Sequence, residues 1–269
     1  MKRDYLSYTA LKQFAKSPNH YLESVSGERT QSDAMLVGSA LHCAVLEPDH
    51  YATRYTTAPN VNRRTKAGRE QWEQHEADAI ARGMSILTSE QAHQIERMSE
   101  AIKAHKLASE LLAGLETEVQ LGGELYGVQF RGIADAMNVD RVIDIKTTRD
   151  ASPDGFKREA SNLDYHLQAA IYRRLADVDD FSWVVVENCE PFNVAVYRPS
   201  FESIHAAEMY LQDLCGKFKA WDGTPEGYAA HSIELGLPPW HPAMNLIRLQ
   251  PSALIDNSDH SFNQFIQSL

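Results

Sequence analysis

The feature that most constrains the fold is a continuous run of β-forming sequence, TEVQLGGELYGVQFRGIADAMNVDRVIDIKTT, at residues 117–148. Its β-branched and aromatic residues and its Gly and Asn punctuation predict three successive strands, at about 116–121, 124–137 and 141–147. The turns are expected near Gly122-Gly123 and at residues 138–140. Three strands joined by short turns predict an antiparallel meander at the centre of the domain.

The third of these strands has an unusual composition. Val142, Ile143 and Ile145 are apolar and β-branched, as a buried strand prefers. Side chains alternate between the two faces of a strand, so Asp144 and Lys146 project from the same side. A carboxylate and an ammonium on one face of an apolar strand form either a structural ion pair or part of a chemical site.

The remaining chain predicts helices before and after the meander. They are expected at about 7–16, 34–46, 66–82, 89–112, 162–176 and 201–220, with further strands at about 182–189 and 192–198, an irregular segment at 51–65 and a loop around Pro153-Asp154-Gly155. This order favours one α/β domain over residues 1–269. We expect a mostly helical part at 1–115, a sheet core at 116–200, and a C-terminal helix with an extended tail at 201–269.

Composition narrows the class of protein. No segment approaches the roughly 18 consecutive apolar residues of a membrane span, and the N-terminal sequence MKRDYLSYTA lacks the apolar core of a signal peptide. The scattered Cys43, Cys189 and Cys215 fit a reducing cytoplasm and offer no zinc or iron–sulfur framework. A formal net charge of -11 argues against a surface coated with nucleic acid, so any DNA must meet a local basic track.

Two aspartates on neighbouring predicted strands suggest a metal site. Asp135 lies in GIAD near the end of the second strand, and Asp144 lies in the third. If these strands are antiparallel neighbours, the two carboxylates converge at one sheet edge, which is how Mg²⁺ is usually held. The alternative is that each aspartate pairs with a nearby arginine, which would be Arg131, Arg141 or Arg149.

Other polar residues can join this site. The Lys146 ammonium can position a water or neutralise a phosphate, or simply pair with Asp144. His42 lies four residues after Gly38 on one helix face, where glycine would allow close approach to the sheet. Its imidazole can bind a divalent metal, including Mn²⁺, although a lone histidine on an apolar helix is more often a core residue.

Three further groups complete the candidates. Gln168 and Tyr172 share a helix face, which is either a functional face or an ordinary polar surface. Glu118 could reach the same sheet edge, although Glu116 and Glu124 lie nearby in the sequence. The densest basic cluster is a candidate clamp for DNA phosphates, or else a solvated charge run, and Trp72 beside it could stack on a base or join the core. The cluster consists of Arg63, Arg64, Lys66 and Arg69.

Together these motifs resemble the PD-(D/E)XK nuclease superfamily, and within it the branch of phage and prophage RecE (exonuclease VIII) and RecB-like proteins. That branch is recognised by GxxxH, GxxD, DxK and QxxxY motifs. Here the four motifs, in the same order, are Gly38 to His42, Gly132 to Asp135, Asp144 to Lys146, and Gln168 to Tyr172. The resemblance covers about residues 5–200 and implies a restriction-endonuclease-like core, a mixed central sheet flanked by helices, with N-terminal helical additions.

The resemblance also implies roles for these residues. His42, Asp135 and Asp144 would bind Mg²⁺, with Mn²⁺ as a substitute and two ions per site, and the Ile145 carbonyl would be a further ligand. Lys146 would activate or position the attacking water. Gln168 and Tyr172 would organise the DNA end and the metal site.

RecE-type enzymes imply a function and partners. They would digest linear double-stranded DNA from its ends, 5′ to 3′, and leave 3′ single strands for recombination by annealing. They would form a ring-shaped homo-oligomer, with a tetramer favoured over a trimer, and would work with a RecT-like single-strand annealing protein. In such a ring the exterior can stay acidic while Arg63, Arg64 and Lys66 line the DNA passage.

Three rival functions stay open at this point. The same fold could serve a single-strand or structure-specific endonuclease, which would also cut closed circular DNA. The chain could be a non-catalytic module that binds DNA ends, in which case Lys146→Ala would change nothing measurable. A metal enzyme acting on a small phosphorylated substrate is a third possibility, although the sequence offers no Gly-rich phosphate loop.

Overall fold

Five strands form a central sheet in the order β3-β4-β5-β6-β7 in the computed structural model, which describes residues 3–27 and 31–225. The β5–β6 pair is parallel and the other three pairs are antiparallel, so the sheet is mixed. The strands are β3 Glu116–Leu125, β4 Val128–Met137, β5 Arg141–Thr148, β6 Asp180–Glu187 and β7 Val194–Tyr197. The predicted antiparallel meander is β3-β4-β5, and it carries most of the candidate site.

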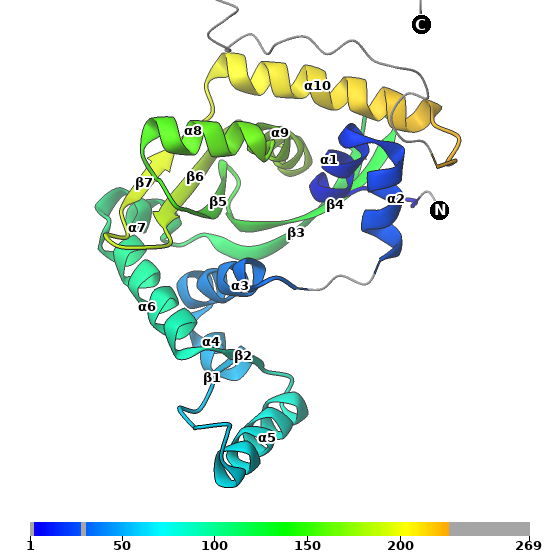
Figure 1. Ribbon diagram of the computed structural model, residues 1–269. Helices are drawn as coiled ribbons and strands as arrows, with labels where there is room; N and C mark the ends of the chain where they lie inside the picture. The colour runs from blue at the N-terminus through cyan, green and yellow to red at the C-terminus, as the bar shows by residue number, and fades with distance from the viewer. Residues whose placement is uncertain (1–2, 28–30, 226–269) are drawn as a thin grey trace, which may run out of the picture. The chain divides into compact units, whose positions relative to one another are not determined.

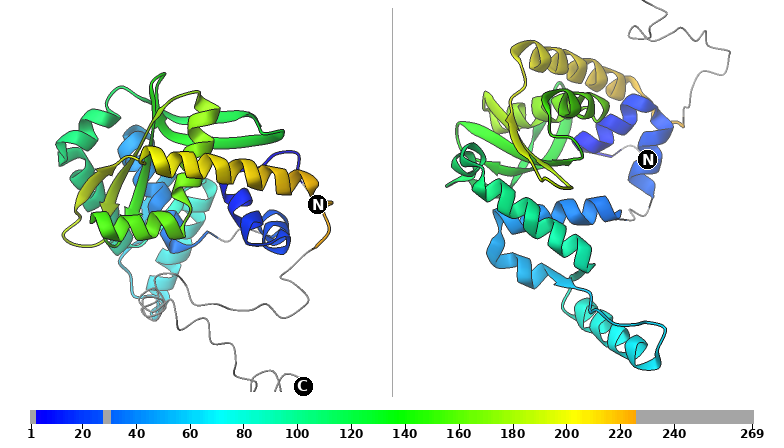
Figure 2. Two further views of the ribbon diagram at one scale, coloured as in Figure 1. Left: turned by 90° about the horizontal axis from the view of Figure 1, so that it is seen from above. Right: turned by 60° about the vertical axis from the view of Figure 1, so that its left-hand side comes forward.

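Helices cover both faces of this sheet, as Figures 1 and 2 show. One face packs against α1, α2, α8, α9 and α10, and the other against α3, α6 and α7. Their bounds are α1 Tyr8–Lys16, α2 Pro18–Ser26, α3 Asp33–Leu46, α6 Ser89–Ala104, α7 Lys106–Leu112, α8 Pro153–Asn162, α9 Tyr165–Ala176 and α10 Phe201–Ala220. The mixed sheet flanked by helices, with additional N-terminal helices, confirms the predicted fold class.

Strand β5 supplies side chains to both layers because its residues alternate. Val142 belongs to the core under α9 and α10, whereas Ile143 and Ile145 belong to the core over α3 and α6. All three are 1% exposed or less. Asp144 and Lys146 therefore face α9, on the same side as Val142, as the alternation predicted.

The β3–β4 turn lies closer to the C-terminus than the sequence predicts. Gly122 and Gly123, taken above as the turn, lie inside β3 and pair with β4. The chain instead reverses at Tyr126 and Gly127, whose φ angles of 52° and 77° are both positive. Two consecutive positive φ angles suit the twist of a two-residue hairpin, and glycine adopts one of them without steric cost.

Several helix predictions needed correction. The segment 51–65 is not wholly irregular, because it contains the end of α4 Pro48–Arg54 and all of β1 Tyr55–Thr57. The helix expected at 89–112 is divided into α6 and α7 at His105, which caps α7. The loop around Pro153-Asp154-Gly155 is instead the first turn of α8, since Ser152 is a side-chain N-cap and proline fits the first helical position.

A helical arm extends from the α3 side of the sheet. It consists of α5 Lys66–Ala81 and its adjoining loops, and it is connected to the body through the two-stranded parallel sheet of β1 and β2 Ser85–Leu87. Figure 1 and the right-hand view of Figure 2 show α5 projecting away from the central sheet. Thr65 caps this helix by accepting a hydrogen bond from the Gly68 N–H.

The described residues lie within one unit, Met1–Gly227. Among them, no helix combines the length and the apolar character that crossing a membrane requires. The extended tail predicted after residue 221 falls mainly on residues 226–269, which lie outside the described residues. A single domain over residues 1–269 therefore stays a prediction.

Candidate metal and active site

The site forms where β4 and β5 separate. These strands pair at Ala136 with Ile143 and at Met137 with Val142, and the pairing goes no further. Asp135 is the next residue of β4, and its Oδ2 accepts a hydrogen bond of 2.7 Å from the Ile145 N–H. The carboxylate of Asp135 thus occupies the opening between the strands, where it is 9% exposed and held by the backbone.

His42 approaches this carboxylate from α3 on the other side of the opening. Its Nδ1 lies 3.4 Å from Asp135 Oδ1, and its Nε2 lies 3.0 Å from the Ile145 carbonyl oxygen. Burial lowers the pKa of His42, but the Asp135 carboxylate outweighs it and raises the pKa to about 9. Burial likewise raises the pKa of Asp135, and His42 outweighs it, so that the net pKa is lowered.

The expected reason for Gly38 was wrong. A methyl group built on Gly38 meets no atom within 4 Å, so glycine is not needed for close packing of α3 on the sheet. This glycine lies on the same face as His42 and leaves open space beside it.

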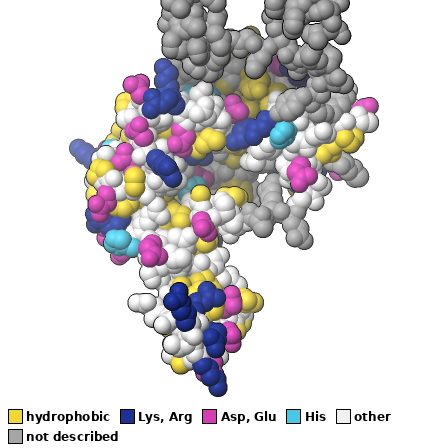
Figure 3. Space-filling view, in the orientation of Figure 1, with side chains coloured by type: hydrophobic (Ala, Val, Ile, Leu, Met, Phe, Trp, Pro, Cys, Tyr) yellow, Lys and Arg dark blue, Asp and Glu magenta, His cyan; other side chains and the backbone are white. Residues whose placement is uncertain are grey.

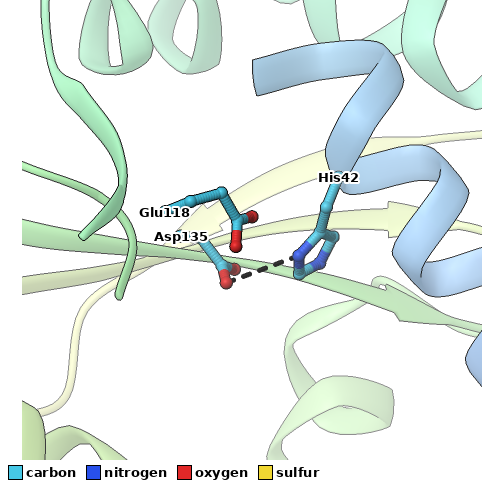
Figure 4. Close-up of side chains that lie close together, drawn as sticks. All are labelled: His42, Glu118 and Asp135. Atoms are coloured by element: carbon cyan, nitrogen blue, oxygen red, sulfur yellow. Dashed lines mark ion pairs between the residues drawn. The ribbon is translucent and has the colours of Figure 1, made fainter. Parts of the chain in front are cut away.

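Glu118 completes a group of three potential ligands, drawn in Figure 4. One donor atom from each of His42, Glu118 and Asp135 lies within 4.8 Å of the other two. Glu118 lies opposite Asp135 in the β3–β4 ladder, and the pairing skips both residues. Its φ of 54° is a left-handed conformation that a non-glycine residue adopts at a cost. Such strain concentrates at functional sites, which distinguishes Glu118 from Glu116 and Glu124.

The chemistry of this donor group fits a divalent cation. Burial and then the neighbouring Asp135 raise the pKa of Glu118, since two carboxylates this close repel one another. A cation between them would relieve that repulsion. Opposite ligands of an octahedral Mg²⁺ are about 4.2 Å apart, so the 4.8 Å spread needs only a small adjustment. Carboxylate oxygens with one imidazole suit Mg²⁺ or Mn²⁺.

Asp144 lies outside that group and forms a second cluster with Lys146 and Gln168. The Lys146 Nζ is 2.6 Å from Asp144 Oδ2, and the Gln168 Nε2–H donates a 2.9 Å hydrogen bond to Asp144 Oδ1. Burial raises the pKa of Asp144 to about 6, against the opposing effect of Lys146. The two clusters meet at Ile145, because Asp144 and Lys146 flank the residue whose backbone contacts Asp135 and His42.

Gln168 and Tyr172 support this cluster from inside the protein. They are 7% and 8% exposed, so they are not the polar surface face that was the alternative. The Tyr172 ring packs on Gly132, where an added Cβ would lie 2.8 Å from the ring. Burial raises the pKa of Tyr172 to about 12, so its hydroxyl stays protonated at neutral pH. The GxxD glycine is therefore required by the QxxxY tyrosine.

The predicted arginine partners of the aspartates do not take that role. Arg141 pairs with Asp180 at 3.9 Å, and the Arg131 guanidinium lies 4.4 Å from the centre of the Tyr5 ring. The partners of Asp135 and Asp144 are instead His42, Lys146, Gln168 and the Ile145 N–H. The ion pair between Lys146 and Asp144, which was the structural alternative, is present within the site.

The basic cluster lies on the arm, apart from the residues above. Arg63, Arg64, Lys66 and Arg69 are all exposed on α5 and the loop before it. Figure 3 shows these Lys and Arg side chains gathered at the lower end of the molecule. The Arg63 guanidinium stacks 4.2 Å from the centre of the half-buried Trp72 ring, and Lys66 lies 3.8 Å from Glu70.

Sequence reasoning missed one neighbour of Lys146. The Tyr165 ring lies beneath the ammonium, with Lys146 Nζ 4.8 Å from the ring centre. The available signal was its position on α9, one helical turn before Gln168. That signal was concealed because the sequence placed the start of this helix at about residue 162, in a different register of packing.

Comparisons with known proteins agree with the fold. The model of a family described as a PDDEXK-like domain of unknown function (DUF3799) matches residues 7–220. The crystal structure of a candidate exonuclease from Eubacterium rectale aligns with a TM-score of 0.56 at 14% identity, over 80% of each chain. A phage-related exonuclease from Haemophilus somnus 129PT aligns at 14% identity over 79% of this chain and 96% of that one, but its TM-score of 0.28 carries no argument. No curated protein matches the sequence.

The family match spans most of the chain and contains all four motifs. Residues 7–220 include His42, Asp135, Lys146 and Gln168, together with the sheet and both helical layers. The resemblance to the PD-(D/E)XK superfamily is thereby confirmed. This chain belongs to the PDDEXK-like family DUF3799.

Proposed function

We propose that this protein is a Mg²⁺-dependent exodeoxyribonuclease that digests linear double-stranded DNA from its ends. The observation that carries the proposal is the junction at Ile145, which places the donor group of His42, Glu118 and Asp135 next to the Lys146 ammonium. Phosphodiester hydrolysis needs both a site for a divalent ion and a cation near the phosphate. Similarity in fold to a candidate exonuclease supports the same activity.

Each residue then has a defined task. His42, Glu118 and Asp135 would hold a divalent ion, with Asp144 available for a second ion if its bond to Lys146 rearranges. A bound divalent ion would supply a polarised phosphoryl oxygen and a water of lowered pKa. The Ile145 carbonyl, expected as a ligand, accepts from His42 Nε2 and so orients Nδ1 toward Asp135. The Lys146 N–H groups would neutralise charge on the phosphate.

The exposed basic arm would bind DNA outside the catalytic site. Arg63, Arg64, Lys66 and Arg69 are long cations on a projecting element, which suits contact with phosphates on both sides of a duplex. A local basic patch on a protein of net charge -11 restricts DNA to that region.

The resemblance to RecE-type enzymes supports further proposals. Digestion would run 5′ to 3′ and leave 3′ single strands, which a RecT-like annealing protein would use in recombination. The subunits would form a ring, with a tetramer favoured over a trimer, around the DNA. Sedimentation analysis of the full chain tests the ring, because a strictly monomeric protein at micromolar concentration would exclude it.

One assay separates these activities. The substrates are a plasmid in closed circular form, the same plasmid linearised, and linear duplexes whose 5′ ends or 3′ ends carry phosphorothioate blocks, all with Mg²⁺. We expect digestion of the linear and 3′-blocked DNA, and resistance of the circular and 5′-blocked DNA. Cutting of the circle would support the endonuclease, and digestion from 3′ ends alone would refute the proposed direction.

Two lysine variants provide the control for that assay. Lys146→Ala should lower the rate by about 100-fold or more, as expected when a group that stabilises transition-state charge is removed. Lys157→Ala changes an exposed lysine on α8 and should leave the rate unchanged. Equal rates for Lys146→Ala and the wild type would favour a non-catalytic DNA-end-binding module.

A further inference from the structure

The Lys146 ammonium is held from two sides by different kinds of group. On one side Asp144 Oδ2 lies 2.6 Å from Nζ, and on the other the face of the Tyr165 ring lies 4.8 Å away, measured to its centre. An aromatic face attracts a cation through its quadrupole without accepting a directed hydrogen bond. The Lys146 N–H groups that do not contact Asp144 therefore remain available to a substrate oxygen.

The position of Tyr165 is itself fixed by contacts from three elements. Tyr165 begins α9 immediately after Asp164, whose φ of 56° forms the sharp turn from α8. The carbonyl of Leu163, at that turn, accepts hydrogen bonds from the Tyr8 hydroxyl and, at 3.3 Å, from the Lys12 ammonium, both on α1. The Phe156 ring of α8 packs on the Tyr165 ring with centres 6.0 Å apart. The ring face is thus set before a substrate arrives.

We propose that Tyr165 is a positioning residue that directs the Lys146 ammonium toward the scissile phosphate. This inference rests on the proposed nuclease function. The ring restricts a flexible four-carbon side chain to one region beside Asp144, which lowers the cost of ordering it in the transition state. The contribution belongs to the ring face and not to the hydroxyl, so phenylalanine should replace tyrosine and an aliphatic residue should not.

Two substitutions of Tyr165 test this assignment by steady-state kinetics on linear duplex DNA. Tyr165→Leu should lower kcat by about 5- to 30-fold, the loss expected for a partly desolvated cation–π contact, with KM for DNA changed by less than about 2-fold. Tyr165→Phe should retain kcat within about 2-fold. If Tyr165→Leu matches the wild type, or Tyr165→Phe is as slow as Tyr165→Leu, the proposal is wrong.

Tyr197→Leu is the matched control for lost packing. Tyr197 is half-buried and stacks on the same Phe156 ring at 5.0 Å, but Lys146 lies over Tyr165 and not over this ring. Its replacement should lower the melting temperature as much as Tyr165→Leu does while leaving kcat unchanged. An equal fall in kcat for both leucine variants would assign the effect to general packing and overturn the proposal.

A spectroscopic measurement separates this inference from the nuclease proposal. The ε-methylene protons of Lys146 should be shifted upfield by the Tyr165 ring in the NMR spectrum of the wild type and of Tyr165→Phe, and should return to the ordinary position in Tyr165→Leu. A wild type with the shift but no hydrolysis would refute the nuclease function and hence the role of the contact. A wild type that hydrolyses DNA without the shift would refute the role of Tyr165 alone.

Discussion

At the scale of single residues, Gly132 shows how tightly two motifs depend on each other. An added Cβ would lie 2.8 Å from Tyr172 Cε1, and Tyr172 is too buried to move freely. We therefore predict that Gly132→Ala lowers the free energy of unfolding by about 1–3 kcal/mol, as overpacking does. Urea denaturation measures this directly, and the displaced ring should also weaken the bond between Gln168 and Asp144.

Gly122 provides the control for that substitution. It lies in the adjacent strand β3, where an added Cβ would be 3.6 Å from the Phe130 carbonyl oxygen, an ordinary contact. Gly122→Ala should change the free energy of unfolding by less than about 1 kcal/mol. Equal losses for the two alanine variants would show that the Tyr172 contact does not explain the glycine.

Glu118 combines a backbone cost with a chemical role, and two substitutions separate them. Glu118→Gly and Glu118→Ala both remove the carboxylate, so both should weaken Mn²⁺ binding measured by calorimetry to the same extent. Glycine tolerates a φ of 54° and alanine does not, so Glu118→Gly should be more stable by about 1 kcal/mol. Unchanged Mn²⁺ affinity in both variants would remove Glu118 from the metal site.

Sequence spacing identified most of this site but not its geometry. His42, Asp135, Asp144 and Lys146 were selected from residue type and position, and the structure brings them together around Ile145. The strained φ of Glu118 follows from a ladder that skips one position, which local propensity does not reveal. The contact of Tyr165 with Lys146 joins α9 to β5 and depends on packing between elements.

At the scale of elements, the arm formed by α5 and its loops makes a prediction about DNA affinity. Arg63→Ala with Arg64→Ala should weaken duplex binding and lower the slope of log K against log salt by up to about 1.8, since each lost phosphate contact contributes about 0.9. Fluorescence anisotropy with EDTA present measures binding without cleavage. Stability should be nearly unchanged because both side chains are exposed.

An exposed lysine on α10 serves as the control for the arm. Lys217 lies in the helical layer on the face of the sheet opposite α3, and its partner is Asp213 at 2.7 Å. Lys217→Gln changes the net charge without touching the arm, so it should leave the salt slope unchanged. The same slope for the arginine variants and the wild type would mean that the arm does not bind phosphates.

Helix limits were predictable where a cap and a periodic face agree. Ser200 before α10 and Ser7 before α1 gave nearly the observed starts. Prediction failed where one residue serves two elements: Ser17 ends α1 and also caps α2 by accepting from the His20 N–H, so the sequence read as a stop. Pro153-Asp154-Gly155 failed similarly, because turn-forming residues also start helices.

At the scale of the whole molecule, the site depends on the separation of two central strands. Strands β4 and β5 share only two paired positions, and Leu6 instead joins β4 through hydrogen bonds with Gln129 and Arg131. The mixed order of the sheet was predictable from a meander followed by a helical crossover. The early end of the β4–β5 pairing was not, because it depends on a carboxylate taking the place of a backbone partner.

Metal binding at that opening should stabilise the entire unit. A ligand that binds only the folded state adds about 2.7 kcal/mol at 100 times its dissociation constant, so Mn²⁺ should raise the melting temperature of metal-free wild type by several degrees. Asp135→Asn removes a central ligand charge and should show little or no rise. The same rise in both proteins would place the metal elsewhere.

The most direct test of a metal-dependent nuclease site measures nucleotide release from end-labelled linear duplex by protein freed of metal, before and after Mg²⁺ is added. Wild type should release nucleotides only after Mg²⁺ is added, and Asp135→Asn should be slower by about 100-fold or more, the scale of a lost metal-assisted step. Equal release without metal, or release by Asp135→Asn at the wild-type rate, would contradict a site built around His42, Glu118 and Asp135.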